Sequence, residues 1–141
     1  MRICREQSKY GRIGKGNIVK NELKPSTMSY EFGIDFLNGE KSDKFVERID
    51  IMLEHFLEAI ESNGCSLIGH IKLILDAGNK GLLMGSVTSF RKKVGWKGSL
   101  SQEVGNLTIL LNVIVYGIED EIIDEIVFEM FRFDESIKVS Q

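Results

Sequence analysis

GCSLIGHIKLIL, residues 64–75, is an apolar run that contains a histidine and a lysine two positions apart. Successive side chains of a β-strand point to opposite faces, so the run separates into two sets. The odd-numbered set is apolar and is expected to face a core: Leu67, Gly69, Ile71, Leu73 and Leu75. The even-numbered set is mixed and is expected on the other face: Ser66, Ile68, His70, Lys72 and Ile74. The run therefore predicts a strand that presents His70 and Lys72 away from the core.

Two further runs of this kind follow, LLMGSVTSF at 82–90 and NLTILLNVIVY at 106–116. The short turn DAGNKG before the first of them favours an antiparallel hairpin. If the register of 82–90 holds, the mixed faces of the three strands combine into one surface. We expect a ligand-binding site there, formed by His70, Lys72, Ser86, Thr88 and Asn112. The same face carries several large apolar residues, so we expect it to be covered by the N-terminal arm, another subunit or a ligand.

The remaining elements complete an α+β domain. MSYEFGIDF, residues 28–36, alternates as a half-buried strand does. A helix is predicted after it from an apolar stripe of Phe45, Ile49, Met52, Leu53, Phe56, Leu57 and Ile60, and a second helix follows Glu119. The predicted order is β-α-β-β-β-α, an antiparallel sheet of an N-terminal strand and a three-strand meander with both helices on one face. We predict a basic, Gly- and Lys-rich flexible arm at 1–26 and a single domain at 27–141.

Charge and cysteine content restrict the function classes. The formal net charge of −3 argues against nucleic acid as the principal partner. Two distant cysteines without a secretory signal fit a reducing compartment, and no apolar run approaches the roughly 20 residues that span a bilayer. We therefore expect a soluble cytoplasmic protein that does not contact membranes. Its basic first segment and acidic last segment could pair with each other or with those of other copies. Together with the partly apolar mixed face, this leads us to expect a homo-oligomer or a protein partner.

The chemistry of the mixed face allows two interpretations besides simple solvation. Lys72 could supply a point charge for a small anionic ligand, with the hydroxyls and amide of the face fixing its orientation. Alternatively, His70 could act as acid and base in a small enzyme that uses Lys72 as its anion anchor. The sequence places no acidic residue beside His70, so His70 is a catalytic candidate only. His55, Cys65 and His70 match no zinc spacing, and we predict no metal site. The sequence does not identify a cofactor.

A long connection, RKKVGWKGSLSQEVG at 91–105, joins the last two predicted strands. Loops of this length are commonly functional or disordered. Its basic residues surround the sole tryptophan, and together they could contact a phosphate or a nucleic-acid base. The residues predicted to make this contact are Arg91, Lys92, Lys93, Trp96 and Lys97. A mobile hairpin tip explains the same composition. Nucleic-acid contact is therefore an alternative function, and it predicts binding that weakens steeply with salt.

The phrases IGHIKLIL, GSVTS and LTILLNVIVYGI resemble the C-terminal accessory region of some CobW-like P-loop GTPases, which are associated with metal and cobalamin handling. The resemblance covers about residues 43–132. This sequence has no Walker A motif, so GTP hydrolysis does not carry over. The resemblance implies a stand-alone accessory module in which His70 and Lys72 match the first phrase, and Ser86 and Thr88 the second. We therefore expect a non-enzymatic binding or accessory protein.

Overall fold

A computed structural model describes the backbone of residues 3–7 and 24–132, with the side chains of residues 24–131. The predicted α+β class with an antiparallel sheet and two helices is confirmed. In chain order the elements are β1 (Ile3–Gln7), β2 (Pro25–Lys41), α1 (Ser42–Ser62), β3 (Leu67–Asp76), the 3-10 turn η2 (Gly78–Lys80), β4 (Gly81–Val87), β5 (Gly95–Leu100), β6 (Glu103–Tyr116) and α2 (Asp120–Arg132).

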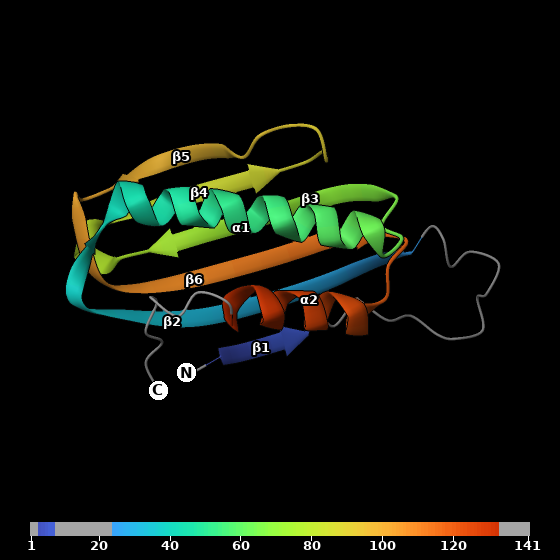
Figure 1. Cartoon of the computed structure of the whole chain (residues 1–141), viewed down its shortest axis with the longest axis horizontal. Coiled ribbons are helices and arrows are strands. Elements are labelled where there is room, and N and C mark those ends of the chain that lie inside the picture. Colours follow the sequence, from blue (N-terminus) through green and yellow to red (C-terminus); the bar gives the residue numbers. More distant parts are fainter. Residues whose placement is uncertain (1–2, 8–23, 133–141) are drawn as a thin grey trace.

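The strands form one sheet in the order β1-β2-β6-β3-β4-β5, with every neighbouring pair antiparallel. Both helices lie on the same face of this sheet (Figure 1). The structure differs from the predicted meander because β6 returns between β2 and β3 instead of following β4. Two strands are additional to the prediction: β5 lies within the predicted loop 91–105, and β1 within the predicted arm 1–26. Residues 8–23 of that arm lie outside the described residues.

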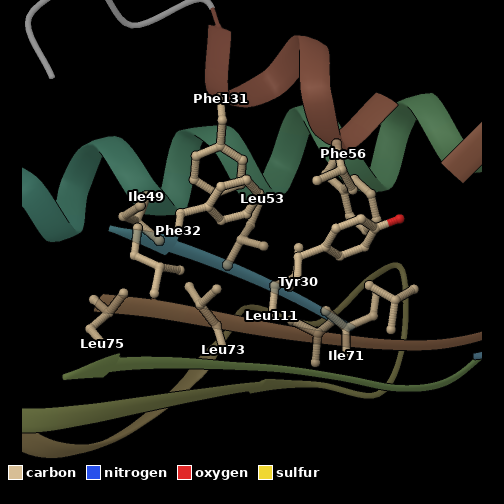
Figure 2. Close-up of a cluster of buried hydrophobic side chains, with 14 of the residues drawn as sticks. Tyr30, Phe32, Ile49, Leu53, Phe56, Ile71, Leu73, Leu75, Leu111 and Phe131 are labelled. Atoms are coloured by element: carbon tan, nitrogen blue, oxygen red, sulfur yellow. The ribbon is translucent and has the colours of Figure 1, made fainter. Parts of the chain in front are cut away.

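The core fills the space between the sheet and the helices (Figure 2). Alternate residues of β2 point into it, which confirms the predicted half-buried strand. The buried residues are Met28, Tyr30, Phe32, Ile34 and Phe36. The predicted stripe of α1 meets them, with Phe45, Phe56 and Ile60 almost completely buried. Aromatic rings connect β2 to α2, because the Phe32 and Phe131 ring centroids are 3.9 Å apart. This one-sided core leaves the other sheet face without a described helix.

The predicted faces of β3 require a correction at its first residues. Ile68 was expected opposite the core and Leu67 within it, but Ile68 is 5% exposed and Leu67 is 58% exposed. The pairing of β3 with β6 shifts register between Ile68 and His70, so Gly69 is an extra, bulged residue that reverses the alternation. A Cβ atom on Gly69 would lie 3.0 Å from the backbone oxygen of Ile114, which explains the glycine. From His70 onward the predicted faces hold.

Candidate functional site

The sheet face turned away from the helices, here called the open face, contains a polar row across four strands. In the middle of the row, Asn112 of β6 pairs with Ser29 of β2 on one side and with Lys72 of β3 on the other. Lys72 in turn pairs with Ser86 of β4. Directly paired residues of an antiparallel sheet point to the same side. The Ser29 hydroxyl donates a 2.7 Å hydrogen bond to Oδ1 of Asn112. The structure thus brings Lys72, Ser86 and Asn112 together as the sequence predicted.

His70 joins this row from the neighbouring position of β3. Its Nε2 atom lies 2.8 Å from Oγ of Ser86, and the ring is half-buried. One of the two groups donates and the other accepts, depending on the imidazole tautomer. Within residues 24–132, no carboxylate forms a hydrogen bond with His70. The ring is therefore held by a hydroxyl group, and the described residues supply no acidic partner that would orient a catalytic base.

Lys72 is the charged centre of the polar row. Its side chain is half-buried, and it makes no hydrogen bond or ion pair with the described part of the chain. The next row of the open face is apolar in its middle, where Leu110, Ile74 and Met84 pair across three strands. Lys72 therefore extends beside apolar surface with an ammonium group that is available to a partner.

Charged residues of both signs surround that apolar row. Glu31 of β2 stands at one end of it, paired with Leu110, and Lys97 of β5 at the other, paired with Met84. Asp76 lies four residues beyond Lys72 on the same face of β3, where it pairs with Thr108 of β6. Sequence reasoning missed Ser29 and Glu31 in this surface. Their own strand was predicted, but nothing in its pattern shows that β6 is its partner.

Thr88 does not belong to this surface. β4 ends at Val87, and Thr88 is an exposed residue of the following loop. The residues predicted for nucleic-acid contact are also dispersed. Nη2 of Arg91 lies 3.4 Å from Oε2 of Glu61 in α1. Lys92 and Lys93 are exposed in the loop, and Lys97 lies on the open face.

Trp96 lies on the opposite side of the sheet from Lys97. Its Nε1 atom donates a 3.0 Å hydrogen bond to Oδ1 of Asp50 in α1. Its ring covers Gly85 of β4 so closely that a Cβ atom there would lie 2.8 Å from Cζ3. The indole is therefore a packing residue that holds β5 to α1.

A cavity of about 450 Å³ lies at the end of the sheet where β3 turns into β4. Its lining includes neither His70 nor Lys72 and consists of Gly33, Ile34, Asp76, Ala77, Gly78, Asn79, Asn106, Leu107 and Thr108. Asp76 is partly engaged there, because its Oδ1 accepts a 2.9 Å hydrogen bond from the backbone N–H of Gly78. In the described residues, no group of three or more His, Cys, Asp or Glu side chains could hold a metal ion.

Cys65 precedes β3 and is 4% exposed. Its thiol donates to the backbone oxygen of Leu67 at 3.5 Å. Burial disfavours the thiolate and raises the pKa of this group above its ordinary value, although backbone hydrogen bonds oppose the shift. A thiol held in its neutral form is a poor nucleophile, so Cys65 belongs to the core.

Neither helix in the described ranges is long and apolar enough to cross a membrane. Comparison of the chain with protein-family models, curated proteins and solved structures found no match. The geometry of the open face is therefore the basis for a functional assignment.

Proposed function

We propose that the protein is a non-enzymatic binding module that recognises a protein partner through its open face. The observation that carries the proposal is Lys72, a half-buried cation beside the apolar row of Leu110, Ile74 and Met84 that has no partner among the residues the structure describes. Protein interfaces combine an apolar centre with a polar rim in this way. An apolar sheet face that water alone covers is unfavourable, and a partner relieves that cost.

The shape of the face favours a protein over a small molecule. Small-ligand sites are concave and enclose most of their ligand. The polar row lies on paired strands of one sheet, and the cavity of about 450 Å³ at the sheet end is lined by other residues. A small anion could contact Lys72, but this cavity does not extend to that side chain. A partner with its own surface relief supplies the enclosure that this face lacks.

The contact between His70 and Ser86 favours a second candidate, a small enzyme with His70 as acid and base and Lys72 as anion anchor. A serine and histidine pair usually needs a third group that orients the base. Hydrolysis of p-nitrophenyl acetate provides a test. The enzyme hypothesis predicts hydrolysis that His70→Ala and Ser86→Ala both abolish. The binding-module hypothesis predicts equal rates for both variants and the unaltered protein.

The resemblance of residues 43–132 to the accessory region of CobW-like GTPases supports metal or cobalamin handling as the setting of this module. Absorbance titration with cobalamin tests that setting. Saturable binding that Lys72→Ala weakens would link the open face to the cofactor. A spectrum that the protein does not change would remove cobalamin itself as the ligand, and a protein partner would remain.

Assembly size tests the main proposal. Ile74→Asp places a charge in the middle of the open face, and Ile51→Asp places one on an exposed position of α1, where Ile51 is 53% exposed. In extracts of the native cells, we expect the unaltered protein and Ile51→Asp to elute well above the monomer mass of 16.0 kDa. Ile74→Asp should elute at that mass. Equal elution of the two variants, or a monomeric unaltered protein, would contradict the proposal.

A further inference from the structure

We infer that the partner of the open face is a second copy of this chain. The two copies pack face to face about a two-fold axis that crosses the strands at Ile74. The inference rests on the proposed function and adds the identity and the register of the partner. Its evidence is the distribution of charge on the open face, which is complementary to itself.

Acidic and basic groups both occupy the described part of this face. Strand pairing places the carboxylates of Glu31, Asp35 and Asp76 on it, together with the ammonium groups of Lys72 and Lys97 and the imidazole of His70. A uniformly acidic partner would be repelled by the first set and a uniformly basic partner by the second. A surface with the same mixture can place opposite charges against each other. Two-fold symmetric interfaces have this property because each copy contributes the same patch.

The spacing of charges along β3 fixes the axis. Lys72 and Asp76 are two residues before and two residues after Ile74, and all three point to the open face. Lys72 and Asp76 are separated by about 13 Å along the strand, so they do not meet within one chain. A two-fold axis across the strands at Ile74 places Lys72 of each copy opposite Asp76 of the other. Each interface then contains this ion pair twice.

The other rows agree with that axis. The apolar row of Leu110, Ile74 and Met84 meets its own copy and forms the centre of the interface. Asn112 meets Thr108 of the other copy, and both side chains can donate and accept. Among the side chains that the structure describes, like charges face each other only at the two ends of the apolar row, at Glu31 and Lys97. Two packed sheets are commonly rotated by about 30° relative to each other. Such a rotation moves the like charges at the ends of the row apart more than it moves the residues near the axis.

The available area is sufficient for such an interface. Five strands spaced about 4.8 Å apart span about 24 Å, and nine residues at about 3.3 Å span about 30 Å. The product, roughly 700 Å², is close to the roughly 800 Å² per partner that standard interfaces bury. Side-chain relief increases the true accessible area. Leu82, 45% exposed on this face, adds to the apolar part.

Charge reversal tests the inference in the full-length protein by sedimentation equilibrium. Lys72→Asp makes the centre of the face acidic, and Asp76→Lys makes it basic. We expect each variant alone to dissociate at least tenfold more readily than the unaltered protein. An equimolar mixture of the two variants should restore dimers, because each copy then meets its opposite charge. Lys44→Asp and Glu58→Lys, both at exposed positions of α1, are the matched controls and should leave the dimer unchanged.

A second measurement does not depend on those variants. In a Cys4→Ser background, Ile74→Cys lies on the proposed axis, and a short bis-maleimide should join it to its own copy. Ile51→Cys should not be joined. Any of three results would overturn the inference: the purified protein stays monomeric, neither charge reversal weakens the dimer, or the cysteine at position 74 is not cross-linked. If the purified protein is monomeric but Ile74→Asp still reduces assembly size in extracts, the proposed function stands and this inference fails.

Discussion

His70 and Ser86 lie on neighbouring strands of the open face, with Nε2 of the histidine 2.8 Å from Oγ of the serine. Lys72 occupies the position of β3 directly opposite Ser86. The hydroxyl therefore holds the imidazole beside the lysine and fixes the polar half of the surface. A fixed surface loses little conformational entropy when it binds a partner.

Removing the Ser86 hydroxyl should lower the free energy of unfolding. A net intramolecular hydrogen bond is worth about 0.5–1.5 kcal/mol, and we expect Ser86→Ala to cost that amount. Urea denaturation measures it. Ser99→Ala is the control, because Ser99 is an exposed residue of β5. Equal stability of the two variants would show that the contact between His70 and Ser86 does not contribute to the fold.

The close contact between Gly85 and Trp96 should make Gly85 intolerant of a methyl group. A Cβ atom at Gly85 would lie 2.8 Å from the indole, so Gly85→Ala must displace Trp96 from α1. Overpacking of this kind costs about 1–3 kcal/mol. Thermal unfolding and the emission of the sole tryptophan report both effects. Gly105→Ala is the control because its Cβ atom meets nothing within 4 Å. A blue-shifted or unchanged emission in Gly85→Ala would contradict the packing described.

Tyr30 should anchor α2 to the sheet through its hydroxyl. Tyr30 Oη donates a 2.6 Å hydrogen bond to Oδ1 of Asp124. Hydrogen bonds to charged groups contribute about 1.5–3 kcal/mol, so we expect Tyr30→Phe to lose that much stability while its ring still packs. Tyr116→Phe, on the open face, should change stability by less than about 0.5 kcal/mol. Chemical denaturation of both variants distinguishes the two positions.

Stability should fall at high pH because of Cys65. Its pKa is raised in the folded protein above the ordinary value of 9.0, since burial disfavours the thiolate. Above that value the unfolded chain loses a proton that the folded chain keeps, so the unfolded state is favoured as pH rises. Denaturation curves at pH 8 to 10.5 should therefore show a shallower decline for Cys65→Ala than for the unaltered protein. Parallel declines would mean that the thiol is not protected by the fold.

Much of the fold could be predicted because its signals are local. The apolar stripe of α1 and the alternation of β2 extend over consecutive residues, and both were found. The position of β6 between β2 and β3 depends on pairing between distant residues, such as Ser29 with Asn112, which no single stretch encodes. The strand β5 was missed because Gly95 and Gly98 interrupt its short pattern.

The candidate site was partly predictable for the same reason. His70 and Lys72 are two residues apart on one strand, so their common face follows from the strand period. Ser86 joined them because the hairpin register held. Leu67 and Ile68 changed faces because Gly69 is a bulge, and an isolated glycine in a strand only suggests one. Thr88 was assigned to the site because the end of β4 is not marked in the sequence.

Photo-crosslinking from the open face tests the central claim most directly. Benzoylphenylalanine at position 74 would lie in the middle of the face, and at position 51 on the exposed side of α1. After irradiation in the native cells, we expect a protein adduct from position 74 and none from position 51. An adduct of twice the monomer mass identifies a second copy, and another mass identifies a different partner. No intermolecular adduct from position 74, or equal adducts from both positions, would contradict the assignment of the open face as a binding surface.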